Sequence, residues 1–326
     1  MSTKRQPETI RISEADSNIH FRWDRSIQPI AKVAEGDLVI FECRDGANDQ
    51  FQKNSRNEDV MKISYEKVHA LTGPVAIDSA SPGDTLEVEI VDVKPRRDWG
   101  WTFIQPGQGI LASDPSLVSL EDSLFEHPYL ALWTFAENRA RFGDIASVPI
   151  RPFMGVMGVA PRLKGIYKTI PPFEIGGNLD IRQLVKGSRI FFPVFNKGAL
   201  FSVGDGHAAQ GDGEVCVSAI ETSMEFACRF KVHKEMTVTS VHAIIPSQNN
   251  YADAAGYYLT TGISADMPDA ARQAVREMLT WLAQERHIRS DEAYVIASIA
   301  GDLKISQAVN LPNWTVSFTV PLSVFH

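Results

Sequence analysis

The stretch GDGHAAQGDGE, residues 204–214, gathers Asp205, His207, Asp212 and Glu214 within eleven positions and contains no lysine or arginine. Carboxylate oxygens and imidazole nitrogens supply lone pairs, and glycines let the backbone turn sharply or approach a bound group closely. These residue types suit a divalent cation, and the histidine favours zinc over calcium. The spacing matches neither HExxH nor an EF-hand loop. On spacing alone, a cation site and a pair of Gly-Asp turns with a surface histidine remain equal alternatives.

A second acidic cluster follows the apolar run DLVIF, where ECRDGANDQF places Glu42, Asp45, Asn48 and Asp49 close together. Strand ends that open into Asx-rich loops are common ligand positions, but Asx residues also make ordinary turns. Among the other histidines, His20 lies beside aromatic residues and is a possible ligand or a hydrogen-bonded structural residue. The remaining ones have no companion ligands nearby in the sequence and are expected to be structural or exposed: His69, His127, His233, His242, His287 and His326.

Motifs for a nucleophilic serine or a bound nucleotide are missing. The sequence has no GxSxG elbow, no Walker loop and no GxGxxG between a strand and a helix, and the SxxK match at Ser64–Lys67 lacks its companion motifs. The three cysteines are too separated for a disulfide scaffold or a cysteine zinc cluster, and we expect buried thiols. An enzyme with this sequence would activate water rather than use a serine.

The elements that must position these residues are mainly β-strands. Short β-branched and aromatic runs separated by turn residues predict strands at 36–45, 73–78, 84–95, 188–195 and 214–232. Pro- and Gly-rich stretches at 79–84, 105–110, 152–165 and 169–180 predict turns and ordered loops.

Helical patterning is concentrated near the C-terminus. Pro268, Asp269 and an apolar stripe predict a helix over 267–287, and Ser290 is expected to cap a second helix that Gly301 ends. The runs LKISQAV and WTVSFTVPLSV predict closing strands. We therefore expect a mainly β fold, a β-sandwich or jelly-roll-like body over 1–232, followed by an α+β portion over 233–326.

Composition narrows the class of protein. A net charge of −8 with scattered basic residues excludes a nucleic-acid footprint, and anionic membranes are equally poor partners. No signal-like apolar segment and no run long enough to span a bilayer occurs in the sequence. We expect a cytoplasmic protein and, because exposed strand faces need covering, a homo-oligomer of undefined size.

Several separated motifs resemble the acetamidase/formamidase family. They are GALFSVGDGHAAQGDGEVCVSAIE (198–221), TGPVAIDSASPGDTLEVEIVDVKP (72–95), GVAP (158–161) and GGNLD (176–180), in matching order. The resemblance covers at least residues 28–232. It implies a β-rich, metal-dependent enzyme that hydrolyses short aliphatic amides to a carboxylate and ammonia. It places function at Asp205, His207, Asp212 and Glu214, together with a further set: Asp45, Glu221, Gln210 and Asn178.

The chemistry of an amide suggests a role for each residue type. A bound dication would polarise the carbonyl and supply activated water, while a carboxylate would carry protons. Our hypothesis is that Asp45, His207 and Asp205 or Asp212 bind the metal, zinc in preference to calcium. Glu214 would then transfer the proton, with Asp45 as an alternative catalytic base. Gln210, Asn178 and Glu221 would contact the substrate.

Two alternatives to a linear amide remain open. The aromatic and methionine-rich stretches 99–103 and 152–161 would line an apolar pocket for a small cyclic amide, a γ-lactam, unless they simply form core. In the alternative from another class, the Asp/Gly turns hold a structural ion in a non-catalytic sugar- or ion-binding β-sandwich.

Overall fold

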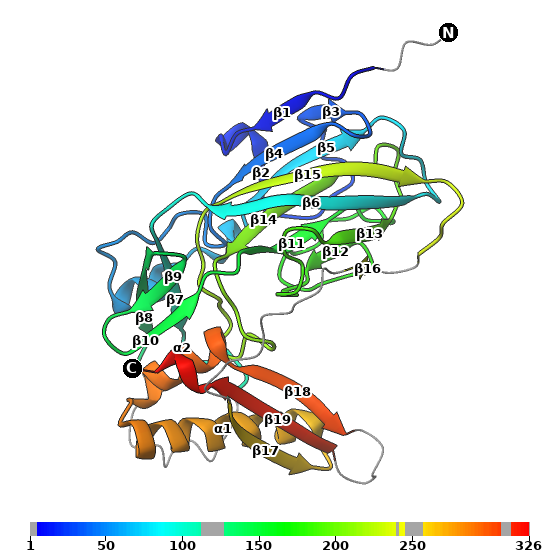
Figure 1. Cartoon of the computed structure of the whole chain (residues 1–326). Helices are drawn as coiled ribbons and strands as arrows, with labels where there is room; N and C mark the ends of the chain where they lie inside the picture. Colours follow the sequence, from blue (N-terminus) through cyan, green and yellow to red (C-terminus); the bar gives the residue numbers. More distant parts are fainter. Residues whose placement is uncertain (1–4, 112–126, 239–240, 245–256, 308–313, 326) are drawn as a thin grey trace.

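Two facing β-sheets form the body of the protein (Figure 1). The computed structural model describes residues 5–111, 127–238, 241–244, 257–307 and 314–325. Aromatic side chains fill the space between the two sheets. The ring of Phe201 lies 5.9 Å from that of Phe41 and 5.2 Å from that of Phe230, centroid to centroid, and all three are fully buried. The predicted β-sandwich body with a C-terminal α+β portion is confirmed.

The first sheet has the order β1-β4-β15-β6-β13-β16, and its bounds are β1 Thr9–Ile12, β4 Leu38–Cys43, β15 Met224–His233, β6 Thr85–Pro95, β13 Arg189–Pro193 and β16 His242–Ile244. All neighbours are antiparallel except β1 and β4. In β6, the alternation in the sequence places Leu86, Val88 and Ile90 in the core as expected.

The second sheet has the order β12-β11-β14-β5-β2, and β3 pairs in parallel with β5. The bounds of its strands are β12 Gly176–Asn178, β11 Phe153–Gly158, β14 Phe201–His207, β5 Leu71–Ile77, β2 Ile19–His20 and β3 Ala31–Val33. The end of β14 lies between β11 and β5. In this register Phe153 is opposite His207, and Leu71 is opposite Gly204. Polar residues near the ends of β12, β14 and β5 are thereby brought to one region of the molecule.

A smaller antiparallel sheet, β7 to β10, adjoins this region, with the bounds β7 Trp99–Ile104, β8 Tyr129–Ala136, β9 Arg139–Phe142 and β10 Ala146–Pro149. Glu221 connects it to the second sheet. Its backbone forms isolated bridges with Trp101 of β7 and with His207 of β14. Short 3-10 helices complete this part of the chain: η1 Asp16–Asn18, η2 Asn57–Lys62 and η3 Tyr65–Lys67.

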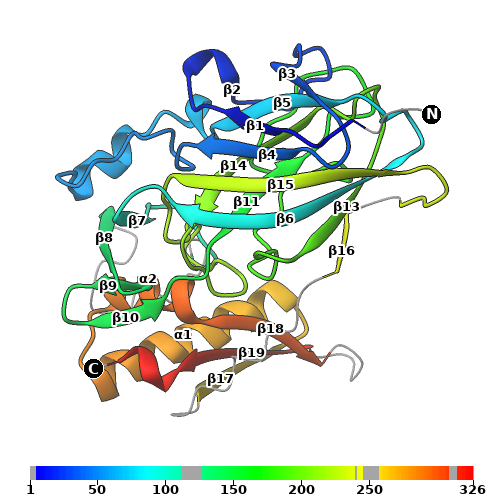
Figure 2. The same ribbon diagram turned by 45° about the horizontal axis from the view of Figure 1, so that its top comes forward.

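The C-terminal portion is a three-stranded antiparallel sheet with two helices, seen below the sandwich in Figures 1 and 2. The bounds of its elements are β17 Tyr257–Ser264, α1 Met267–Arg286, α2 Ser290–Ala300, β18 Asp302–Gln307, β19 Trp314–Pro321 and η5 Leu322–Val324. Helix α1 packs on β17 and β19. None of the described helices is long and apolar enough to cross a membrane.

Both predicted helices are present. Asp266 caps α1, since its carboxylate accepts a hydrogen bond from the Asp269 N–H at 2.8 Å. Ser290, however, is the first residue of α2 rather than its cap; Arg289 occupies the cap position and makes no side-chain capping bond. Gly301 follows the last residue of α2 as predicted. The last two residues of LKISQAV lie outside the described part of the chain.

Some predictions of strands and loops need correction. The run 214–232 was predicted to be one strand, but β15 begins only at Met224, and positive φ angles of 41° at Glu214 and 79° at Val217 interrupt the extended chain before it. Conversely, β11 lies inside the predicted loop 152–165, and β12 lies inside the predicted loop 169–180. The proposed boundary at 232/233 stays a prediction: it falls at the end of β15, and β16 beyond it still pairs with β13.

Candidate active site

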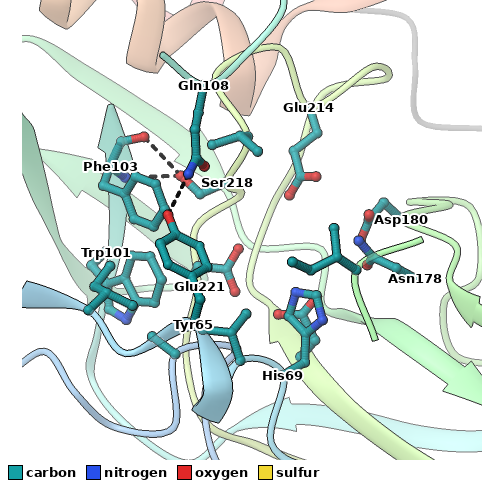
Figure 3. A pocket seen from close by; sticks show the side chains of 17 residues that line it. Tyr65, His69, Trp101, Phe103, Gln108, Asn178, Asp180, Glu214, Ser218 and Glu221 are labelled. Atoms are coloured by element: carbon teal, nitrogen blue, oxygen red, sulfur yellow. Dashed lines mark hydrogen bonds and ion pairs between the residues drawn. The ribbon is translucent and has the colours of Figure 1, made fainter. Parts of the chain in front are cut away.

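A cavity of about 120 Å³ lies where the second sheet meets β7 (Figure 3). Four carboxylates and one imidazole line it: Asp180, Asp205, Glu214, Glu221 and His69. A second imidazole, that of His207, lies against these carboxylates. Asp205 and His207 are two residues apart on β14, so both side chains point to the same face of the sheet. Asp180 follows β12, and His69 precedes β5. Figure 3 shows Glu214, Glu221 and His69 directed toward one common space.

The two carboxylates nearest His207 converge on its Nε2 atom. Asp205 Oδ2 and Glu221 Oε1 each lie 3.2 Å from that nitrogen. Neither contact has the alignment of a hydrogen bond, and His207 Nε2 has no hydrogen-bond partner among the described residues. His69 Nε2 lies 4.0 Å from Asp205 Oδ2. Possible ligand atoms from β14, from Glu221 and from His69, which precedes β5, therefore face one another across a small buried space, an arrangement that suits a cation.

Gln210 settles which nitrogen of His207 carries the proton. Its Nε2 lies 3.0 Å from the Asp180 backbone oxygen, which can only accept a hydrogen bond. The amide oxygen must then face His207 Nδ1, at 2.9 Å, so Nδ1–H donates, and in the neutral imidazole the lone pair is on Nε2. The structure therefore places the predicted substrate-binding Gln210 against His207 and Asp180 rather than in the cavity wall.

Burial and crowding shift the acidities of this cluster. Burial raises the pKa of Glu221 to about 8 and that of Asp180 to about 7. Burial acts against protonated His207, yet the charges of Glu221 and Asp205 raise its pKa well above the usual value. Burial opposes ionisation of Asp205 too, but His207 and His69 hold the pKa of Asp205 below its ordinary range. Burial lowers the pKa of His69.

The residues present fit a metal ion. Unpartnered buried atoms, considered among the described residues, include four that belong to residues lining this cavity and one beside them, His207 Nε2: the four are His69 Nδ1, Asn178 Oδ1, Asp180 Oδ1 and Glu221 Oε2. Buried polar atoms without partners are costly, and the raised pKa values of Asp180, Glu214 and Glu221 show that ionising all four carboxylates together is unfavourable without a further cation. A dication would relieve both conditions. Oxygen and nitrogen donors of this kind suit zinc or a similar ion.

Two residues predicted as metal ligands lie outside the cavity. Asp45 is fully buried, and its carboxylate accepts hydrogen bonds from the Asp49 N–H at 2.9 Å and from Trp101 Nε1 at 3.3 Å, beside Arg97. Asp212 accepts a bond from Gln183 Nε2 at 2.9 Å and pairs with Arg182. The hydrogen bonds of both acids direct their carboxylates toward neighbouring loops and away from His207.

Sequence reasoning also missed two members of the cluster. His69 was expected to be structural or exposed, and the structure places it in the cavity wall. Asp180 lies two residues after the predicted Asn178 in the same GGNLD segment, which was the available signal for it. No local signal marks His69, since only the pairing of β5 with β14 brings it to Asp205.

The backbone of Gly46 lies directly against the carboxylates of Asp205 and Glu221. A Cβ at this position would lie 2.1 Å from Asp205 Oδ1 and 3.0 Å from Glu221 Oε2. We expect Gly46→Ala to displace the Asp205 carboxylate and lower kcat/KM by about 100-fold, because small displacements of reacting groups have effects of that size. Steady-state kinetics and metal content check this.

The matched variant for that test is Gly36→Ala. Gly36 has a φ of 84°, and a Cβ there would meet nothing within 4 Å. Its backbone strain should lower the melting temperature and leave kcat/KM unchanged. Wild-type kinetics in Gly46→Ala would contradict the close packing of this loop on the site.

Comparisons with known proteins identify the class of enzyme. The chain is 27% identical to the formamidase of Methylophilus methylotrophus, over 96% of this chain and 90% of that protein. The structure of a gamma lactamase from Delftia acidovorans superposes with a TM-score of 0.86 at 25% identity, covering 98% of this chain and 93% of the other. The acetamidase structure from Bacillus halodurans gives a TM-score of 0.66 at 31% identity, over 96% and 97% of the two chains. The protein is an amidohydrolase that acts on carbon–nitrogen bonds.

The family follows from a match along nearly the whole chain. The model of the acetamidase/formamidase family matches residues 7–165 and 163–326. The chain belongs to the acetamidase/formamidase family, which confirms the resemblance noted in the sequence. The non-catalytic sugar- or ion-binding alternative is thereby excluded.

Proposed function

We propose that this protein is a metal-dependent amidase that hydrolyses short aliphatic amides to a carboxylate and ammonia. The observation that carries the proposal is the convergence of His207 Nε2 with Asp205 and Glu221 in a cavity that also holds unpartnered polar atoms. Family membership supports the reaction type. Zinc is the preferred ion, and calcium the lesser alternative.

Asp205, His207 and Glu221 would hold the metal, with His69 and Asp180 within reach. This set takes the place of Asp45 and Asp212 in the hypothesis drawn from the sequence. When bound, the ion supplies Lewis acidity toward the amide carbonyl and lowers the pKa of water at the site. Gln210 orients His207 because its amide oxygen accepts a hydrogen bond from Nδ1–H, as neighbouring groups of metal-binding histidines commonly do.

Glu214 is the residue we assign to proton transfer. It lies beside the cluster but comes from the loop after β14, and its side chain faces Glu221 across the cavity (Figure 3). Burial raises its pKa well above the ordinary value. A carboxyl group with a raised pKa can accept a proton from water and donate it to the departing nitrogen. Asn178 Oδ1 is free to accept a hydrogen bond from the substrate amide N–H.

A small cyclic amide is a second candidate substrate of the same reaction type. Trp101 and Phe103, whose rings stack with centroids 5.6 Å apart, line the cavity and provide the apolar wall that a five-membered lactam would contact. The gamma lactamase structure is similar in fold over nearly the whole chain. Met154 and Met157, predicted for the same wall, are core residues instead.

The test is a panel of amides assayed with the purified protein. Formamide, acetamide, propionamide and butyramide release ammonia on hydrolysis, whereas 2-pyrrolidinone yields an amino acid that is measured by amine detection. Turnover of linear amides supports the main proposal, and turnover restricted to the lactam supports the second candidate. Absence of turnover on every compound with the metal-loaded protein would overturn both.

Removal of metal should abolish this activity. We expect dialysis against a chelator to lower the rate by at least about 1,000-fold, since Lewis acidity contributes several kcal/mol. Titration with zinc should restore the rate in proportion to bound metal, measured by elemental analysis. Full activity in protein shown to contain less than a tenth of an equivalent of metal would exclude the metal-dependent mechanism.

The remaining expectations about partners stay predictions. A homo-oligomer and a cytoplasmic location were inferred from the sequence, and neither is tested by the fold. A small amide as the partner agrees with the family.

A further inference from the structure

Val217 has a backbone conformation that a β-branched residue rarely adopts. Its φ angle is 79°, and it is the one β-branched residue with a positive φ among the described residues. Glycine would take this conformation without strain, whereas valine is a genuine outlier there. Its side chain is also 42% exposed and lines the cavity. Strain combined with exposure of an apolar group at a cavity calls for a functional explanation.

Hydrogen bonds on both sides hold Val217 in this conformation. On one side the Val215 oxygen accepts a bond from the Tyr294 hydroxyl, and the Cys216 N–H donates to Ser298 Oγ at 3.3 Å. Both partners lie on α2. On the other side Ser218 Oγ accepts from the Phe103 N–H at 2.9 Å and donates to the Phe103 oxygen at 3.1 Å. Helix α2 and strand β7 therefore fix the backbone on either side of Val217.

Val217 is part of an apolar rim over a polar floor. Tyr65 and Ile170, which come from η3 and from the loop before β12, line the same cavity and are 38% and 48% exposed. The Tyr65 hydroxyl donates a hydrogen bond to Gln105 Oε1 and accepts one from Gln108 Nε2 at 2.6 Å, and Figure 3 shows the bond from Gln108. Exposed apolar residues gathered around one cavity are typical of a ligand-binding surface.

We propose that Val217 is a specificity-determining residue that binds the alkyl group of the substrate, together with Ile170 and Tyr65. The inference rests on the proposed amidase function. An amide whose carbonyl and nitrogen lie at the polar floor directs its alkyl chain toward the rim. Formamide has no alkyl group and acetamide a single methyl, so the rim favours amides with longer chains, such as butyramide.

The experiment compares kcat/KM for butyramide and formamide in the metal-loaded wild type and in variants. Val217→Thr keeps the branched shape and the backbone strain but replaces one methyl group by a hydroxyl group, and Val217→Gly removes both the side chain and the strain. In each, the ratio of butyramide to formamide should fall about tenfold, the usual effect of removing a small apolar contact. Val217→Gly should in addition melt at or above the wild-type temperature.

The matched control is Ile166→Ala, because Ile166 is 73% exposed and lies outside the cavity lining. Its ratio should equal that of the wild type. Ile170→Ala gives an independent reading should a Val217 variant fail to fold, and its ratio should also fall. An unchanged ratio in the folded rim variants, with an active wild type, would overturn the inference. A wild type inactive on every amide would instead overturn the proposed function.

Discussion

Replacing Asp205 by asparagine should abolish metal binding and lower kcat/KM by about 1,000-fold or more. The Asp205 carboxylate lies 3.2 Å from His207 Nε2 and 4.0 Å from His69 Nε2, so it connects the two imidazoles of the cluster. Its backbone φ is 59°, a conformation that asparagine also tolerates. The substitution therefore removes the negative charge while keeping size and backbone shape.

Asp212→Asn is the matched control for this prediction. Asp212 belongs to the same GDGHAAQGDGE stretch, but it bonds Gln183 and Arg182 outside the cavity. We expect full metal content and kcat/KM within a few-fold of the wild type, as for most partly exposed substitutions. Elemental analysis, ammonia release and circular dichroism of both variants make the comparison. An active, metal-containing Asp205→Asn protein would show that the site is not centred on Asp205.

The contrast between these two acids shows what the sequence could reveal about the site. The stretch 204–214 was singled out from its residue types, and Asp205 and Asp212 were left as equal alternatives for the metal ligand. In the structure β14 ends at His207, so strand geometry orients only Asp205 and His207 together. Asp212 lies beyond the strand, where loop hydrogen bonds decide its direction.

His69 shows why the rest of the site was not predictable locally. It reaches Asp205 because β5 pairs with β14 across more than one hundred residues of sequence, with Leu71 opposite Gly204. A register of this kind depends on the packing of the whole sheet, which one sequence does not display. Asp180 is brought in through β12 and β11 in the same way.

The same difference between local and long-range signals explains which secondary-structure elements were predicted well. Helix α1 was predicted well because its proline, its first-turn aspartate and its apolar stripe are all local signals. The apolar run VCVSAI, by contrast, was interpreted as the start of a strand. It is an irregular segment in which Cys216 and Ser218 bond α2 and β7. The apolar composition of VCVSAI reflects its burial against α2 and β7, although its backbone does not form a regular strand.

Glu214→Gln should lower kcat by a factor of about 100 to 10,000 while leaving metal content and KM near the wild-type values. Glutamine matches the size of glutamate but cannot take up and release a proton. Burial raises the pKa of Glu214 well above its ordinary value, as expected for a group that both accepts and donates a proton near neutral pH. Pre-steady-state ammonia release and elemental analysis measure the two effects.

Glu221→Gln is the comparison that separates proton transfer from metal binding. Both glutamates lie near His207 in the same cluster of possible ligands, and burial raises the pKa of each. Glu221 Oε1, however, lies 3.2 Å from His207 Nε2, so its substitution should release the metal. Loss of metal from Glu214→Gln as well would make Glu214 a ligand, and retained turnover would remove it from the proton path. A loss of kcat with full metal content in Glu214→Gln, together with loss of metal in Glu221→Gln, would show that Glu214 transfers the proton and Glu221 binds the metal. Substitution of the proton carrier leaves the metal bound, whereas substitution of a metal ligand releases it.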